Sequence, residues 1–272
     1  MTGAFANLSS AQQIALTTLR MRALDYHSDR PILGDAISAE LIEKLKHDLA
    51  PERIPTSVVL VHAVRAKSLD AVVRQFVARH PTAVVVDLGS GLDPRAHRCA
   101  PPPGVDWYDV DFPEVARLRQ RFLPRHSHAI GADLTGPAGW LTAIPADRPT
   151  MVVADGLMAL LPGEAFKTLT RNLTSHFSTG ELAFNAYTPF AMRAGNKLPV
   201  LRTVNVPTAG SGFVDPREPQ RWGARLTLIE EILLARAPEV ALYPRPIRTL
   251  ARLTALSTRI SRAGDRIVRY RF

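Results

Sequence analysis

Short apolar runs alternate with helical patterns in the middle of the chain, and this alternation restricts the fold more than any other feature. Residues 83–87 (AVVVD) are apolar and largely β-branched, as in a strand buried on both faces. Stretches with helical spacing separate this run from three similar ones. The strand candidates are 83–87, 106–111, 151–155 and 181–185, and the helices between them are 94–99, 113–123 and 164–177. Because parallel strands need long crossover connections, the pattern predicts an α/β fold with a parallel sheet and right-handed crossovers.

The segments on either side of this region have a different pattern. The first 80 residues carry helical spacing and no strand signal, and Ser9 or Ser10 is a suitable cap for the first helix, as Ser38 is for the second. After Tyr187 a proline-rich stretch predicts a loop. The predicted elements are helices at 8–26, 36–49, 58–80, 226–236 and 246–262, a loop at 188–222 and a terminal strand at 266–272.

The composition is that of a globular protein, because 46% of the 272 residues are hydrophobic and 22% are charged. No apolar run approaches the roughly 18 residues of a membrane-spanning helix. The first residues lack the basic and apolar regions of a secretory signal. The single cysteine, Cys99, cannot form an internal disulfide. We therefore expect a cytoplasmic protein that has no membrane partner.

The net charge of +9 is concentrated in the last third of the chain. Residues 191–272 hold 15 Lys and Arg against 6 Asp and Glu. These arginines are scattered through apolar periodic sequence with few aromatic residues between them, so we expect no nucleic-acid partner. One stripe of arginines is interpreted mostly as a solvated helix face, with a minor role toward an acidic substrate or carrier as the alternative. It comprises Arg245, Arg248, Arg252, Arg259 and Arg262.

A pair of glycines follows the first predicted strand. The strand runs directly into Gly89-Ser90-Gly91, where glycine lets the backbone approach a ligand closely. Asp111 stands twenty residues after Gly91, at the end of the next predicted strand. An acid at that position can bind the two hydroxyls of a ribose. The pattern therefore predicts a nucleoside-containing ligand.

Two further residues argue against a ligand that carries phosphate. Pro94 occupies the position of the third glycine that a dinucleotide pyrophosphate requires, so Asp93-Pro94 instead predicts a cap and a first helical residue. Asp87, beside the loop, disfavours phosphate and favours a cation. A ligand with a ribose, a positive charge and no phosphate indicates S-adenosylmethionine. A tight strand-to-helix turn with a surface aspartate would give the same pattern and stays an alternative.

Three segments together resemble a known family. They are VVVDLGSGLDPRAHR (84–98), VDWYDVDFPEVARLRQRFLP (105–124) and ADGLMALLPGEAFKTLTRNLTSHF (154–177). These segments are similar to the leucine carboxyl methyltransferase superfamily, and most of all to its branch of bacterial polyketide O-methyltransferases of the tetracenomycin type. The similarity covers about residues 60–190 clearly and continues weakly beyond them.

The resemblance implies a fold and a division of the chain. The fold is that of class I S-adenosylmethionine-dependent methyltransferases, an α/β architecture with a Rossmann-like seven-stranded sheet and an antiparallel final strand. A helical N-terminal cap and an inserted lid accompany the sheet. The implied regions are the cap at 1–80, the cofactor-binding core at 81–187, the substrate lid at 188–225, and the closing helices and C-terminal strand at 226–272.

The resemblance also assigns cofactor contacts to individual residues. The methionine part would lie over the loop Gly89, Ser90 and Gly91, beside Asp87. Asp111 would bind the ribose, and Asp133 with Leu134 would flank the adenine. Arg65 would pair with the cofactor carboxylate and Asp155 would face its amino group. Asp155 replaces the glutamate that is usual in this branch, and Ala159 replaces a tyrosine.

The resemblance favours a methyltransferase that uses S-adenosylmethionine to methylate a hydroxyl of a small aromatic or polyketide-like metabolite. The alternatives are a carboxyl methyltransferase, a cofactor-binding member whose activity is lost or diverted because of Ala159, and a nucleic-acid binder. The sequence does not select a general base from its candidates, which are Tyr26, His27, His176, Tyr187 and Trp222. No metal site is expected, because His126 and His128 lack a further ligand nearby in sequence.

Overall fold

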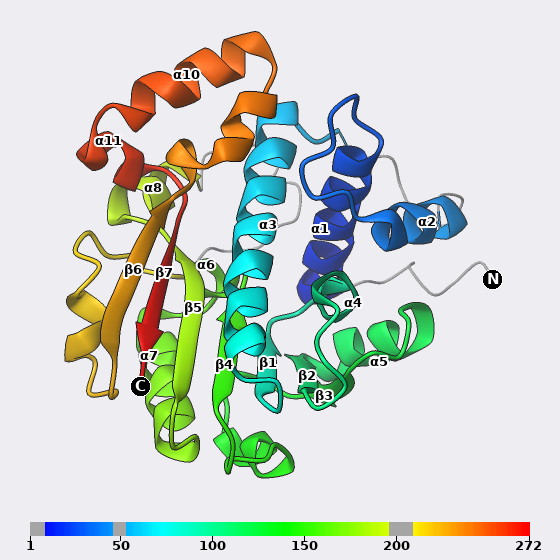
Figure 1. Cartoon of the computed structure of the whole chain (residues 1–272), viewed down its shortest axis with the longest axis vertical. Coiled ribbons are helices and arrows are strands. Elements are labelled where there is room, and N and C mark those ends of the chain that lie inside the picture. The colour runs from blue at the N-terminus through cyan, green and yellow to red at the C-terminus, as the bar shows by residue number, and fades with distance from the viewer. Residues whose placement is uncertain (1–8, 46–52, 196–208) are drawn as a thin grey trace.

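A seven-stranded sheet lies at the centre of the computed structural model, which describes residues 9–45, 53–195 and 209–272 (Figure 1). The strand order is β3-β2-β1-β4-β5-β7-β6. Strands β1 to β5 are parallel, whereas β7 is antiparallel to both β5 and β6. This arrangement confirms the expected sheet with an antiparallel final strand. The strands are β1 (Val84–Leu88), β2 (Asp106–Asp111), β3 (His128–Gly131), β4 (Thr150–Ala154), β5 (Gly180–Ala186), β6 (Thr227–Leu233) and β7 (Arg266–Arg271).

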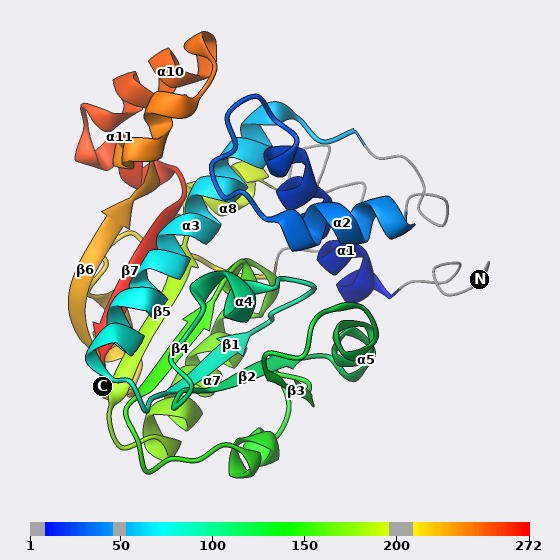
Figure 2. The same ribbon diagram turned by 45° about the vertical axis from the view of Figure 1, so that its right-hand side comes forward.

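Helices cover both faces of the sheet and build two hydrophobic cores. Figure 2 shows α3 lying along one face, with α1 and α2 outside it. Val85 of β1 packs in the core beneath α3, whereas Val84 and Val86 pack in the core beneath α7. Each strand residue therefore alternates between two buried faces, which explains the uninterrupted apolar run. The α-helices are α1 (Ser10–Tyr26), α2 (Ala36–Leu45), α3 (Thr56–Arg79), α4 (Arg95–Cys99), α5 (Pro113–Phe122), α6 (Leu157–Leu160), α7 (Gly163–His176), α8 (Pro189–Gly195), α10 (Arg245–Ala255) and α11 (Thr258–Ala263).

The carboxyl ends of the parallel strands lie at the upper edge of the sheet in Figure 1, since β7 points downward there and runs opposite to β5. This edge carries the loops that follow β1, β2, β4 and β5. Ligands of open α/β sheets bind at such an edge. None of the described helices is long and apolar enough to cross a membrane.

Helix caps differ in part from the prediction. Ser9 caps α1 as expected, and its hydroxyl accepts a hydrogen bond from the backbone amide of Gln12. The cap of α2 is Asp35 rather than Ser38, because the Asp35 carboxylate accepts the amide of Ser38 one turn into the helix. Pro94, rather than Asp93, immediately precedes α4. Leu8 and residues 46–49, which were assigned to predicted helices, lie outside the described residues.

The prediction was wrong in the closing segment. Residues 226–236 do not form a helix, because Thr227–Leu233 form β6 and a short 3₁₀ turn follows. The helix expected at 246–262 is two helices, since Ser257 interrupts it and caps α11 by accepting the amide of Ile260. Strand β3 has no counterpart in the prediction, and α8 lies within the stretch predicted as loop.

Candidate functional site

The turn after β1 is built from the two predicted glycines. Gly89 and Gly91 have φ angles of +62° and +53°, a region that glycine occupies without strain. The amide of Gly89 donates to the Val110 carbonyl at 2.8 Å, which ties the turn to β2. A Cβ atom on Gly89 would lie 3.0 Å from Leu157 Cδ1 of α6. The turn therefore lies close under α6, and a side chain at Gly89 would not fit without a shift.

Asp111 holds this turn from the end of β2. Its carboxylate accepts the Gly91 amide at 2.7 Å through Oδ2 and the Phe112 amide at 2.7 Å through Oδ1. Burial raises the pKa of Asp111, and the two backbone hydrogen bonds oppose that shift. Each oxygen keeps a further lone pair for a hydroxyl donor. The predicted ribose-binding acid is thus fixed beside the glycine turn.

Asp133 and Leu134 lie at the neighbouring strand end. Gly131 of β3 pairs with Asp111 of β2, and Asp133 follows two residues later. The Asp133 side chain is exposed, and its Oδ1 accepts the amide and the hydroxyl of Thr135. Leu134 is buried in the core beneath α7. The two residues predicted to flank adenine therefore share an edge with the predicted ribose-binding acid.

Arg65 projects from α3 and joins two carboxylates. Its Nε lies 2.5 Å from Asp155 Oδ1, and its Nη1 lies 2.7 Å from Asp265 Oδ2. Nη1 also donates to the Tyr187 hydroxyl at 3.1 Å, and Nη2 lies 3.1 Å from His62 Nδ1. Burial opposes the charge of Arg65, but the carboxylates hold its pKa well above the usual value. Arg65 is thus a fixed cation at the carboxyl end of β4.

Asp155 follows β4 and carries the opposite charge at the same place. It accepts Arg65 on one oxygen and Arg95 on the other, the latter at 3.3 Å. Burial works against ionisation, but these two guanidinium groups lower the pKa of Asp155. Next to it, Gly156 has φ +81°, and a Cβ atom there would meet nothing within 4 Å. Asp155 is therefore ionised beside open space.

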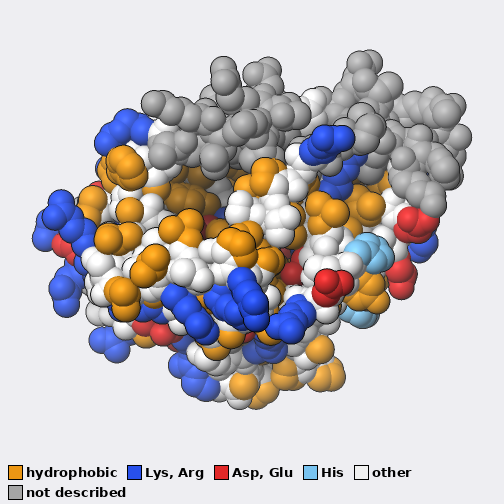
Figure 3. Space-filling view, turned by 90° about the horizontal axis from the view of Figure 1, so that it is seen from above, with side chains coloured by type: hydrophobic (Ala, Val, Ile, Leu, Met, Phe, Trp, Pro, Cys, Tyr) orange, Lys and Arg blue, Asp and Glu red, His pale blue; other side chains and the backbone are white. Residues whose placement is uncertain are grey.

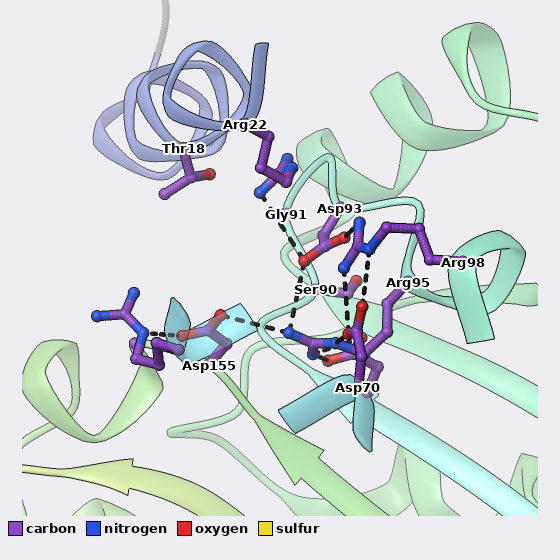
Figure 4. A network of polar contacts seen from close by, with 12 residues as sticks. Thr18, Arg22, Asp70, Ser90, Gly91, Asp93, Arg95, Arg98 and Asp155 are labelled. Carbon is purple, nitrogen blue, oxygen red and sulfur yellow. Dashed lines mark hydrogen bonds and ion pairs between the residues drawn. The ribbon is translucent and has the colours of Figure 1, made fainter. Parts of the chain in front are cut away.

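A cluster of arginines and aspartates supports the glycine turn from below. Figure 4 shows Arg22, Arg95 and Arg98 directed toward Asp93 and Asp70. These arginines come from α1 and α4, and Asp93 lies between β1 and α4, so the cluster joins α1 to the turn. Buried charges at such a density need mutual pairing to remain in the fold. The cluster thus fixes the turn rather than leaving its aspartates free for a ligand.

Asp87 belongs to this cluster. Both of its oxygens accept Arg95 Nη1 at 3.0 Å, and the residue is 1% exposed. Burial raises the pKa of Asp87 to about 7, although Arg95 favours the ionised form. Its contact with a ligand stays a prediction, because the structure places it beneath the turn and in contact with Arg95.

The catalytic candidates fall in different places. Tyr26 and His27 stand exposed at the end of α1, with their rings in edge contact. Tyr187 donates to Asp265 at 3.5 Å and accepts from Arg65. His176 lies at the opposite edge of the sheet, because α7 runs antiparallel to the strands and ends before β5 begins.

The remaining catalytic candidate lies apart from the turn, and a cavity lies beside α5. Trp222 packs in the core against Phe166 and Phe213. At the edge where β3 begins, a cavity of about 440 Å³ is lined in part by Arg119, Arg125 and His128. Trp222 is therefore part of the core, whereas Arg119 links the cavity to the glycine turn, because its Nη1 donates to the carbonyls of Ser90 and Gly91.

The sequence did not predict two of the residues around Arg65. Asp265 precedes β7, and its Oδ1 also accepts the Asn185 amide at 3.5 Å. His62 is buried one helical turn from Arg65, and desolvation followed by the Arg65 charge lowers its pKa to about 3. Nδ1 of neutral His62 accepts from Arg65, while Nε2 has no partner among the described residues. No motif in the sequence marks either residue, since Asp265 and Arg65 lie 200 positions apart.

The arrangement fits S-adenosylmethionine. The hydroxyl of Ser90 is buried at the turn and has no partner among the described residues, so it is free for a ligand. Arg65 and Asp155 offer opposite charges side by side, as the carboxylate and ammonium groups of an amino acid require. Asp111 supplies acceptors for two hydroxyls. An anionic phosphate, by contrast, would meet Asp111, Asp155 and the buried aspartates beneath the turn.

Comparisons with known proteins agree with this geometry. A family model for leucine carboxyl methyltransferases matches residues 15–174. The tetracenomycin polyketide synthesis O-methyltransferase TcmP of Streptomyces glaucescens is 34% identical over 272 residues, which cover 99% of this chain and 100% of that protein. The S-adenosyl-L-methionine-dependent methyltransferase dpfgK of Gibberella zeae is 31% identical over 202 residues, 66% of this chain and 67% of that protein.

A solved structure supports the fold independently. A presumed methyltransferase from Thermobifida fusca matches with a TM-score of 0.54 and 17% identity, over 92% of this chain and 93% of that one. At this identity the match bears on the fold alone. The seven-stranded sheet has the strand directions of class I methyltransferases. The chain belongs to the leucine carboxyl methyltransferase family, and it is an S-adenosylmethionine-dependent methyltransferase.

Proposed function

We propose that this enzyme transfers the methyl group to a phenolic or enolic hydroxyl of a small aromatic or polyketide-like metabolite. The observation that carries the proposal is the 34% identity to TcmP over 99% of the chain. That similarity extends past residues 15–174, to which the family model is confined. It includes the segments on both sides of the cofactor core, where an acceptor would be recognised.

The residues around the turn hold and orient the cofactor. Arg65 binds its carboxylate and Asp155 its ammonium group, so the ion pair between them is exchanged for two pairs to the ligand. Asp111 binds the ribose hydroxyls, and Asp133 with Leu134 flanks the adenine. When bound, the cofactor supplies a methyl group that its positive sulfur already activates. The protein then contributes alignment of the acceptor oxygen and exclusion of water.

The acceptor would lie near α6 and the segment that follows β5. The segment 188–222 carries Phe190, Met192, Phe213 and Trp222, which the sequence predicts as apolar walls of an acceptor pocket. Phe213 and Trp222 instead belong to the core beneath α7, whereas Phe190 is 66% exposed. The Gly210 amide donates to the Ala159 carbonyl at 3.1 Å, which brings the chain back over α6. We therefore assign the acceptor-facing wall to Ala159 and α8.

A base is needed only for a protonated acceptor. Desolvation and Asp265 raise the pKa of Tyr187, and its hydroxyl is bonded to Arg65, so it is poorly suited to take a proton at neutral pH. Tyr26 and His27 are exposed at the end of the cap helix and remain the candidates. For a phenol we expect the rate to rise between about pH 6 and 9, as acceptor or base loses its proton.

The test is a turnover screen with phenols, enolic diketones and carboxylic acids. Turnover is measured as the formation of S-adenosylhomocysteine. We expect turnover with hydroxyl acceptors and a product that resists mild alkaline hydrolysis, as a methyl ether does. Product mass and alkali resistance together distinguish an ether from an ester.

Carboxyl methylation is the second candidate, because the matching family model describes leucine carboxyl methyltransferases. A carboxylate acceptor is already deprotonated at neutral pH, with a pKa near 4. An alkali-labile product and a flat rate between about pH 6 and 9 would therefore favour this function over the first.

A further inference from the structure

The helical pair α10–α11 stands at the periphery of the molecule. It connects β6 to β7 and lies above the sheet edge that carries the cofactor turn (Figures 1 and 2). α10 has no fully buried residue, and only its inner side, with Ile247 and Ala251, packs on the core beneath α3. The outer side of the pair therefore has no partner within the described residues.

This outer side is apolar. Four of its side chains are largely exposed. They are Leu250 at 64%, Leu253 at 59%, Leu256 at 82% and Ile260 at 53% exposed. Leu250 and Leu253 stand three residues apart on α10 and so share a side of that helix, while Leu256 lies at the junction of the helices and Ile260 on α11. Exposed apolar side chains that occur singly are ordinary, but a continuous row of them marks an interaction surface. Leu256, at the junction of the two helices, is the most exposed of the four.

The same surface carries an excess of positive charge, although Arg262 pairs with Glu231 of β6. Residues 240–264 contain five arginines and no aspartate or glutamate. Arg245, Arg252 and Arg259 are exposed and form no ion pair within the described ranges 9–45, 53–195 and 209–272. In the view from above, hydrophobic and basic side chains lie side by side over the left half of the face, where α10 and α11 are found (Figure 3). A partner must therefore combine apolar contact with negative charge.

Three partners could cover this surface: a second copy of the chain, another protein, or a lipid surface. Its exposed leucines and its positive charge decide between them. A second copy would bring Arg245, Arg252 and Arg259 against the same three residues, and residues 240–264 offer no acid to offset them. A protein partner would need a recess or a matched surface, but the apolar side chains project from a convex helical pair. A lipid surface accepts projecting leucines without a matched shape, and anionic headgroups balance arginines at their rim.

We propose that the outer side of α10–α11 binds reversibly to an anionic lipid surface. Leu250, Leu253, Leu256 and Ile260 would enter the boundary between headgroups and acyl chains, with Arg245, Arg252 and Arg259 at the headgroups. The sequence-based expectation of no membrane partner rested on the absence of a spanning stretch, which does not bear on a helix lying in the interface. Bound in this way, the protein would hold the cofactor edge of its sheet close to the lipid.

The test uses the full chain with unilamellar vesicles of phosphatidylcholine alone and of phosphatidylcholine mixed with phosphatidylglycerol. We expect cosedimentation with the mixed vesicles, weakening as salt rises, and little with phosphatidylcholine alone. Leu256→Asp should reduce the partition coefficient by about tenfold or more. Arg252→Glu should reduce it by at least about fivefold, since each basic residue near an anionic surface contributes about that factor.

Two matched variants separate this surface from the charge of the chain as a whole. Val214→Asp changes an apolar side chain that is 60% exposed elsewhere, and Arg217→Glu reverses an exposed arginine elsewhere. Both should bind vesicles like the unaltered protein. The proposal would be overturned if these two control variants lost as much vesicle binding as Leu256→Asp and Arg252→Glu. It would also be overturned if the unaltered protein did not bind the mixed vesicles at low salt. Self-association in sedimentation velocity that Leu256→Asp abolishes, while neither protein binds vesicles, would overturn it as well.

Discussion

Replacing Arg65 by alanine removes one cation from two carboxylates that different parts of the chain supply. The side chains of Arg65, Asp155 and Asp265 are 13%, 11% and 7% exposed. Removing one partner of a buried ion pair costs about 3–5 kcal/mol, because the remaining charge stays desolvated. Asp155 keeps Arg95 at 3.3 Å, whereas Asp265 keeps the Asn185 amide at 3.5 Å. We therefore expect a loss of about 3 kcal/mol in unfolding free energy, mainly from Asp265.

Urea denaturation at pH 7 measures this loss, and a second substitution tests its cause. In the double variant Arg65→Ala/Asp265→Asn the stranded charge is gone, so about 1–2 kcal/mol should return. Arg65→Lys is the matched control that keeps the charge but not the planar fork. A double variant no more stable than Arg65→Ala alone would contradict this explanation, because the loss would then not come from an uncompensated carboxylate at Asp265.

Cofactor binding gives a second measurement on the same variant. Charge-assisted hydrogen bonds contribute roughly 1.5–3 kcal/mol, so Arg65→Ala should weaken S-adenosylhomocysteine about tenfold to a hundredfold in calorimetry. Methylthioadenosine lacks the amino-acid carboxylate, and its affinity should change little. Equal losses for the two ligands would mean that Arg65 supports the fold and does not bind the carboxylate.

Three other substitutions probe the turn and the network around it. Asp111→Ala should weaken S-adenosylhomocysteine about tenfold to a hundredfold by the loss of hydroxyl acceptors, and an unchanged dissociation constant would exclude its ribose role. His62 has a folded pKa of about 3 against 6.5 for a free side chain, so between these values the unfolded chain binds a proton that the folded protein does not. Stability therefore falls as pH falls, by about 2 kcal/mol from pH 7 to pH 5, and urea titrations of His62→Gln should lack this part of the slope. If the unfolding free energy of His62→Gln depended on pH as that of the unaltered protein does, the low pKa of His62 would be contradicted. Gly89→Ala places a Cβ atom at φ +62° and 3.0 Å from Leu157 Cδ1, which should cost about 1–2 kcal/mol in thermal unfolding; an unchanged midpoint would show that the turn relaxes freely.

Elements with a local pattern are predictable from the amino-acid sequence. β1, β4 and β5 are buried on both faces, so their apolar runs are visible without knowledge of the fold. The glycine turn and Asp111 follow strand ends directly, and a parallel sheet brings such ends to one edge. Strand β3 is missing from the prediction because none of its four residues is buried and they give no apolar run. The buried strands, the glycine turn and Asp111 depend on neighbours in sequence, which is why they could be predicted from the sequence.

The closing segment shows where local pattern failed. TLIEEIL (227–233) spaces its apolar residues as a helix would, yet it forms an edge strand. Its two glutamates meet arginines of β7, with Glu230 paired to Arg269 and Glu231 to Arg266. The pairing with β7 and these cross-strand charges outweigh a weak helical preference, because strand formation depends on its neighbours more than on intrinsic propensity.

Which charged groups meet at the site depends on tertiary packing. The resemblance predicts that Arg65 pairs with the cofactor carboxylate, and the structure shows which groups surround it: Asp155 and Asp265, 90 and 200 positions away in sequence. His176 was a candidate base by residue type, and the direction of α7 places it at the opposite edge. Periodicity records which face of an element is buried, and that is a local property of the chain. The position of one buried charge relative to another depends on how distant segments pack, and no local pattern encodes it.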